Sequence, residues 1–201
     1  MKGEIMKSEM MRKIGTKEEM LQNMIPVMLP KNKVSGNVVS CWVKGLEDVA
    51  IVFMARKSDK NKILLCGDVK KLAITKEEIE QCLYQAEYPY ELMKLSDALG
   101  VPDVVNLYVI TNTMKNLGAG ALVNHSVQKA LYEYFNGKNL YILPSSIHEL
   151  LILPEDDSFP RSVEELLSMV KAVNSTEVAE DDFLADHVYY FDFERGISTL
   201  A

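Results

Sequence analysis

The sequence predicts an α+β fold, in which amphipathic helices pack on one side of a mainly antiparallel sheet. Two observations lead to this prediction. Pairs of β-branched and aromatic runs joined by polar turns are typical of hairpins, and there are two such pairs. Three amphipathic helices carry clear start or stop signals. Because the hairpins are separated by single helices, regular parallel βαβ winding is disfavoured.

The first 30 residues differ in composition from the rest and contain seven methionines. The capping-box pattern Thr16-x-x-Glu19 predicts a short helix that Pro26 closes. We expect residues 1–30 to be an N-terminal arm or helix that is mobile or contacts a partner. Residues 31–201 are expected to form a single α+β domain.

Strand-like runs begin after Asn37. The run Val38–Val43 is the first, and a polar turn joins Asp48–Ala55 to Asn61–Cys66 as an antiparallel hairpin. A capping box at Thr75 then opens a helix.

A further helix is expected from Pro89, with Leu92, Leu95 and Leu99 on its inner face and Gly100 as its stop.

The second half reads as a strand, a glycine turn, a helix, a hairpin, a helix opened by the capping box at Ser162, and a terminal strand. The expected ranges are Val104–Thr111, Gly118–Ala121, Val123–Tyr134, Leu140–Leu143 with Glu149–Leu153, a helix from Pro160 through Val173, and His187–Phe193.

Composition excludes several classes of protein. The chain has 201 residues, 48% of them apolar and 25% charged, so collagen-like and disordered classes do not fit. Its longest apolar runs are of strand length, which argues against a membrane protein. Residues 1–75 hold 14 Lys/Arg against 8 Asp/Glu, whereas the rest of the chain carries a balance of −13. Nucleic-acid binding through a basic face is therefore disfavoured.

The three cysteines have no disulfide-framework or zinc-ligand spacing. They are expected to be reduced and mostly buried, and no secretion signal opens the chain, which predicts a cytoplasmic protein.

Gly118-x-Gly120 stands between a strand and a helix, where a phosphate loop would stand. The third glycine of a dinucleotide motif is replaced by Val123. Two glycines at such a place more often serve close packing or a turn with positive φ, which is the favoured interpretation.

The segment Ser145-Ser146-Ile147-His148-Glu149 is the densest group of catalytic residue types. A nucleophilic serine needs a base within hydrogen-bond reach and a third group that orients the base. On a strand, however, Ser146 and His148 would share a face while Glu149 points to the other. The HExxH zinc motif fails because position 152 is Ile. No catalytic residue, metal ligand or cofactor is assigned.

One segment resembles a known family. Leu107–Asn112, the string Tyr141-Ile-Leu-Pro-Ser-Ser-Ile-His-Glu149, and Val173-Asn174-x-Thr176 are similar to a family of gut-type Firmicutes, domain-of-unknown-function (DUF) family 5688. The resemblance runs from about Ile25 to Tyr190. It implies no activity.

Function is therefore expected from binding surfaces. We expect a non-catalytic binding or regulatory module that contacts a protein partner; the alternative is a small hydrolase or ligand-binding enzyme that uses Ser146 and His148. If the strand ending at Asn112 neighbours the hairpin, one pocket is expected to gather the candidate ligand-binding residues. They are Asn112, Gly118, Gly120, Ser145, Ser146, His148 and Glu149. Any ligand-sized polar pocket is then expected to include Ser146 or His148.

Overall fold

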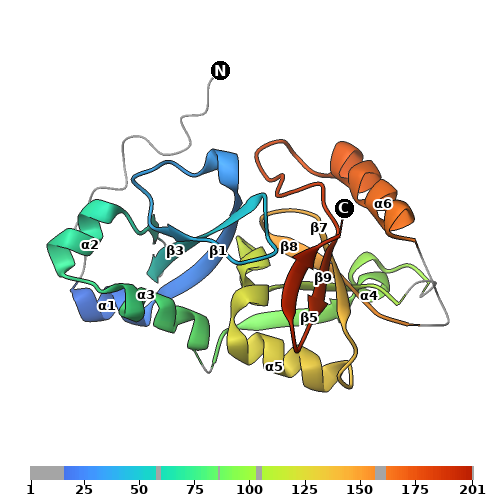
Figure 1. Ribbon diagram of the computed structural model, residues 1–201, viewed down its shortest axis with the longest axis horizontal. Helices are drawn as coiled ribbons and strands as arrows, with labels where there is room; N and C mark the ends of the chain where they lie inside the picture. Colours follow the sequence, from blue (N-terminus) through green and yellow to red (C-terminus); the bar gives the residue numbers. More distant parts are fainter. Residues whose placement is uncertain (1–15, 58–59, 86, 103–105, 157–161, 201) are drawn as a thin grey trace.

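The computed structural model describes residues 16–57, 60–85, 87–102, 106–156 and 162–200. Within them the chain folds into two antiparallel sheets with helices around them, which confirms the α+β class (Figure 1). The strands are β1 (Met24–Pro30), β2 (Ser40–Cys41), β3 (Val49–Lys57), β4 (Lys60–Ile63), β5 (Tyr90–Lys94), β6 (Tyr108–Asn112), β7 (Leu140–Pro144), β8 (Glu149–Pro154), β9 (Tyr189–Asp192) and β10 (Gly196–Thr199). The α-helices are α1 (Lys17–Gln22), α2 (Cys66–Leu72), α3 (Lys76–Glu80), α4 (Leu95–Leu99), α5 (His125–Tyr134) and α6 (Val163–Glu177), and the 3-10 helices are η1 (Lys31–Lys33), η2 (Gln81–Tyr84) and η3 (Gly118–Val123).

The chain before residue 31 contributes to a sheet. Thr16 caps α1 as expected, with its hydroxyl oxygen accepting from the Glu19 N–H at 3.2 Å. The helix ends at Gln22, and β1 then pairs along its whole length with β3. The expected arm is thus corrected for residues 24–30, because their apolar side chains are buried in the core. Residues 1–15 lie outside the described residues.

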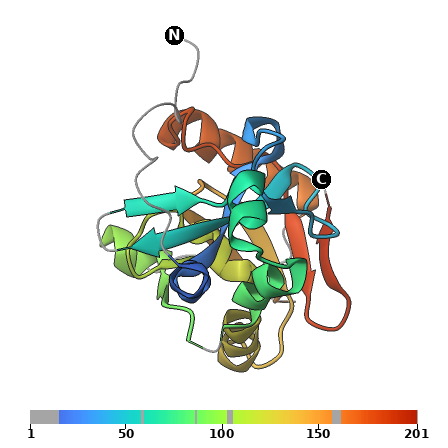
Figure 2. The same ribbon diagram turned by 90° about the vertical axis from the view of Figure 1, so that its left-hand side faces the viewer.

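The small sheet is built around β3. It has β1 on one side, and β2 and β4 on the other, with the β3–β4 hairpin confirmed. The expected strand at 38–43 is reduced to β2 and an isolated bridge between Val38 and Leu65. Figure 2 shows this sheet and the helices α1, α2 and α3 from the side.

The large sheet has the order β10-β9-β7-β8-β6-β5. Alternate side chains divide its two faces, as the pleat requires. One face carries Ile110 and Ile142 into the main core, together with Leu131 of α5. The other carries Leu143 and packs against Leu166 of α6. The expectation that helices cover one side is therefore wrong, because both faces of these strands are apolar and each requires cover.

Capping residues fix the helix starts. Thr75 and Ser162 each form a complete capping box, and the Asn124 side chain accepts from two backbone N–H groups at the start of α5. The starts at Thr75 and Ser162 confirm the sequence-based expectations, whereas α5 begins at His125 and not at the expected Val123, which belongs to η3. The expected contribution of Pro160 lies outside the described residues.

The helix predicted from Pro89 is wrong over its first half. Residues 90–94 form β5, paired antiparallel with β6, and only 95–99 are helical. Leu92, Leu95 and Leu99 have helical spacing, but pairing with β6 outweighs that local pattern. Gly100 does end α4, with φ of +66°.

Thiol burial also differs from expectation. All three cysteines are free, but Cys66 is exposed and Cys41 half-buried, so only Cys82 is a buried thiol. None of the described helices has both the length and the apolar character needed to cross a membrane.

The short helix η3 lies between the two sheets. It contacts β1 on one side and β6 and β8 on the other, and all six of its residues are buried. Gly120 sits against β1, where a Cβ atom would overlap the carbonyl group of Pro26. Packing, the favoured interpretation of this glycine, is what the structure shows.

We predict that Gly120→Ala lowers the free energy of unfolding by about 1–3 kcal/mol, because backbone atoms of β1 would have to move. The matched control is Gly67→Ala in α2, where a Cβ has nothing within 4 Å. That change should be neutral or stabilise the protein by up to about 1 kcal/mol through helix propensity. Urea unfolding of both variants checks this, and equal stabilities would contradict it.

Candidate functional site

The turn between β7 and β8 meets the end of β6 and the start of η3. The carbonyl oxygen of His148 accepts hydrogen bonds from the Thr111 hydroxyl at 2.7 Å and from the Gly118 N–H at 3.0 Å. Ala119 N–H donates to the Ile147 carbonyl at 3.3 Å. The end of β6, Gly118 and the β7–β8 turn therefore lie together, as expected once β6 pairs with β8, whereas Gly120 packs against Pro26 of β1.

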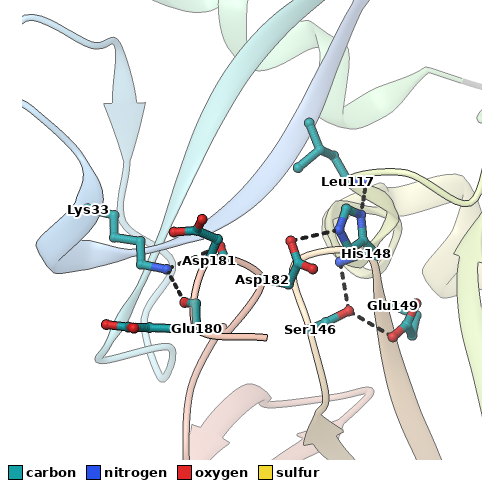
Figure 3. Close-up of polar contacts among 8 residues, drawn as sticks. All are labelled: Lys33, Leu117, Ser146, His148, Glu149, Glu180, Asp181 and Asp182. Carbon is teal, nitrogen blue, oxygen red and sulfur yellow. Dashed lines mark hydrogen bonds and ion pairs between the residues drawn. The ribbon is translucent and has the colours of Figure 1, made fainter. Parts of the chain in front are cut away.

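His148 has partners at both ring nitrogens (Figure 3). The Leu117 N–H donates to Nδ1 at 3.1 Å, and Nε2 lies 3.1 Å from Oδ1 of Asp182. Because Nδ1 accepts a backbone hydrogen, this pattern assigns the ring hydrogen to Nε2. The imidazole links η3 to the loop that carries Asp182.

Ser146 does not face the imidazole as a nucleophile would face its base. Its oxygen accepts from the backbone N–H of His148 at 3.1 Å, and its hydroxyl donates to Oε1 of Glu149 at 2.7 Å. Ser146 is only 5% exposed. A Ser–His–acid triad needs the serine hydroxyl on a free imidazole nitrogen, and this arrangement offers none.

Asn112 and Gly118 also serve the structure around them. The Asn112 side-chain oxygen accepts from the N–H of Met114 at 3.0 Å, and its amide donates to the Asn116 carbonyl at 2.8 Å, so it closes the loop after β6. A Cβ at Gly118 would lie 2.6 Å from the His148 carbonyl oxygen. Ser145 is half-buried in the same turn.

The acidic loop at residues 180–182 also contacts the β7–β8 turn. Ile147 N–H donates to the Asp182 carbonyl at 2.8 Å, and Ser146 forms an isolated antiparallel β-bridge with Phe183. Lys33 of η1 donates to the carbonyl of Glu180 at 2.7 Å and holds the loop to the small sheet (Figure 3). The acidic composition of this stretch carries no signal of a histidine partner, so Asp182 is not among the residues that the sequence predicts for the site.

The three histidines do not converge. His125 stacks on Tyr84 with ring centroids 4.2 Å apart, and His187 contacts Asp48. Among the described residues, no group of three or more His, Cys, Asp or Glu side chains is arranged to hold a metal ion.

A polar pocket lies elsewhere, beside α1 and the α3–η2 segment. It has a volume of about 650 Å³, within the range of ligand sites. Its lining is Leu21, Gln22, Glu78, Gln81, Cys82, Gln85 and Glu87. The expectation that a ligand-sized polar pocket would include Ser146 or His148 is wrong for this pocket. The polar groups of both residues are hydrogen-bonded to other protein groups inside the fold.

Local contacts set the chemistry of this pocket. Lys17 pairs with Glu78 at 2.8 Å and lowers the pKa of that carboxyl, so Glu78 is ionised at neutral pH. Burial raises the pKa of the Cys82 thiol to about 12, which keeps it neutral. The Gln85 amide N–H donates to the Met24 carbonyl at 2.8 Å, leaving its oxygen as the remaining acceptor.

One lining residue of the pocket belongs to a local sequence pattern. Glu78 is the acid of the capping box that Thr75 opens, and its backbone N–H donates to the Thr75 hydroxyl oxygen. Leu21 and Gln22, however, precede Glu78 by more than 50 positions, and no short motif joins them. Packing of α1 beside α3 was needed to bring them together.

Comparison with protein families matches the chain to a family model. The model of the family described as "Family of unknown function (DUF5688)" matches residues 68–193, more than half of the chain. The match begins later than the expected start near Ile25. No curated protein and no solved structure matches the chain.

We predict that Ser146→Ala lowers the free energy of unfolding by about 1–3 kcal/mol, because the His148 N–H and the Glu149 carboxylate each lose a buried partner. Ser145→Ala is the matched control and should change stability by less than about 0.5 kcal/mol. Thermal or urea unfolding makes the comparison. A Ser146→Ala protein of unchanged stability would contradict the structural role.

We also predict that Cys82 reacts with iodoacetamide far more slowly than Cys66 at pH 8. A pKa raised to about 12 leaves little of the Cys82 thiolate, which is the reactive form, and the side chain is 4% exposed. Peptide mass spectrometry after timed alkylation measures both sites. Unfolding in urea should bring the two rates together; a fast Cys82 in the folded protein would contradict the prediction.

Proposed function

This chain belongs to the family of unknown function DUF5688, and we propose that it is a cytoplasmic, non-catalytic binding module that acts through protein–protein contacts. The observation that supports the proposal best is the pocket beside α1 and η2. The pocket presents hydrogen-bond acceptors at an open surface. The residues that resemble a catalytic group, in contrast, are hydrogen-bonded to other protein groups inside the fold.

The pocket suits a basic side chain of a partner protein. Glu87 supplies an exposed carboxylate, and three glutamines add carboxamide groups. Glu78 supplies a second carboxylate, one oxygen of which already pairs with Lys17 from outside the lining. A lysine or arginine has a cationic head for these acceptors and an aliphatic stem for the side chains of Leu21 and Cys82. The wide mouth fits a side chain presented on another protein's surface.

The contacts of His148 and Ser146 argue against the hydrolase alternative. Both imidazole nitrogens have partners, and the serine hydroxyl donates to Glu149. A nucleophile and base that are each bonded to a different group cannot exchange a proton without breaking the turn.

Partner capture from a lysate of the source cell, followed by quantitative mass spectrometry, tests the proposal. We predict that Glu87→Lys reduces the capture of partners about tenfold or more, because a like charge then faces the partner's basic group. The matched control, Glu133→Lys on α5, makes the same charge change at an exposed position outside the pocket and should leave capture unchanged. Equal capture by all three proteins would contradict the pocket as the binding surface.

An esterase and phosphatase screen distinguishes the hydrolase. Wild type and His148→Ala are assayed side by side, with circular dichroism as the check on folding. Turnover by the wild type that is lost in a folded His148→Ala protein would overturn the proposal of a non-catalytic module.

A further inference from the structure

We propose that a second copy of this chain binds along β5, so that the two β5 strands pair antiparallel and join two six-stranded sheets into one of twelve. This inference does not depend on the pocket, which lies on other elements. It rests on the edge that β5 forms, on the phase of its hydrogen bonds and on the pattern of its side chains.

Among the described strands, β5 is one of the two ends of the large sheet. The other end, β10, is covered. The Thr199 hydroxyl donates to the Gly45 carbonyl at 2.8 Å, and the Gly45 backbone lies directly against Ile197. The edge strand β1 of the small sheet is similarly covered by η3. At β5 the sheet order simply stops, and all five of its residues are partly exposed.

The hydrogen bonds to β6 fix which backbone groups of β5 face outward. Leu95 N–H donates to the Leu107 carbonyl at 2.8 Å, and Thr113 N–H donates to the Pro89 carbonyl at 3.3 Å. In an antiparallel ladder such bonded pairs alternate with non-bonded pairs. Tyr90 and Leu92 fall in the non-bonded positions, so their N–H and C=O groups point away from β6 and can pair with another strand.

The side chains favour one register with a second copy. If Leu92 stands opposite Leu92 of the second copy, Tyr90 stands opposite Lys94, and Glu91 stands opposite Met93. This register centres the pairing on Leu92 and opposes no like charges. A shift of the second strand by two residues in one direction places Glu91 opposite Glu91 of the second copy, which is destabilising. The same shift in the opposite direction shortens the paired segment.

Exposed apolar side chains flank the edge in a matching way. Met114 is 52% exposed and lies in the loop next to the start of β5, whereas Leu99 and Val101 are 63% and 50% exposed and follow its end. Antiparallel pairing about a two-fold axis brings the start of one β5 next to the end of the other. Met114 of each copy would therefore meet the Leu99 and Val101 region of the other copy, and the contact closes on itself.

The first experiment measures self-association by sedimentation equilibrium over a range of concentrations. The wild type should show a monomer–dimer equilibrium. Leu99→Glu with Met114→Glu should raise the dimer dissociation constant about tenfold or more, because like charges then face each other. Leu99→Glu with Met114→Lys should restore dimerisation, since the two charges attract. Leu200→Glu, an exposed position at the other end of the sheet, is the control and should leave the constant unchanged.

The second experiment tests the register by disulfide formation in a Cys66→Ser background. Glu91→Cys with Met93→Cys places cysteines directly opposite each other in a non-bonded pair and should cross-link the dimer rapidly on oxidation. Glu91→Cys alone should cross-link slowly, because its own copy lies two residues away along the strand.

Three results would overturn the inference. They are a wild-type protein that stays monomeric at all concentrations, a dimer that Leu99→Glu with Met114→Glu leaves unchanged, and faster cross-linking by Glu91→Cys alone. Each is independent of the capture experiment, so failure of the pocket proposal and failure of this one are distinguishable.

Discussion

The close approach of η3 to both sheets is the constraint on which the rest of the structure depends. Gly118 lets the helix reach the backbone of Asn112 and His148, and Gly120 lets it reach the backbone of Pro26. No side chain fits at either position, so the two glycines set the separation of the small sheet from the large one. The buried side chains of η3 then fill the space between the sheets.

The β7–β8 turn depends on that placement. Once η3 is in position, its first N–H groups bond the carbonyls of Ile147 and His148, and the imidazole of His148 bonds the Leu117 N–H. The acidic loop bonds the same turn from the opposite side through Asp182. A set of residues that resembles a catalytic group is thus a junction of four chain segments. Its polar groups stabilise the junction, and this leaves binding surfaces as the better basis for function.

The pocket and the β5 edge occupy different parts of the molecule. The pocket belongs to the α1 and α3–η2 segments beside the small sheet, whereas β5 ends the large sheet. A dimer formed through β5 would carry two pockets, one on each copy. Two linked pockets would bind a partner with two basic sites more tightly than either pocket alone, provided that the partner spans them.

The sequence by itself determined the fold class, most helix starts and both hairpins, because capping and alternating apolar patterns act over a few residues. Thr75, Ser162 and the β7–β8 strands are examples in which the local pattern and the tertiary structure agree. It also showed that Gly118 and Gly120 were better suited to packing than to phosphate binding. Only the tertiary structure decided that residues 24–30 and 90–94 are strands, since their partners β3 and β6 supply the hydrogen bonds that local propensity does not predict. For the same reason it alone decided the roles of Ser146 and His148, because Asp182 and Leu117 lie more than 30 positions away from His148 and reach it only through the packing of η3 and the acidic loop.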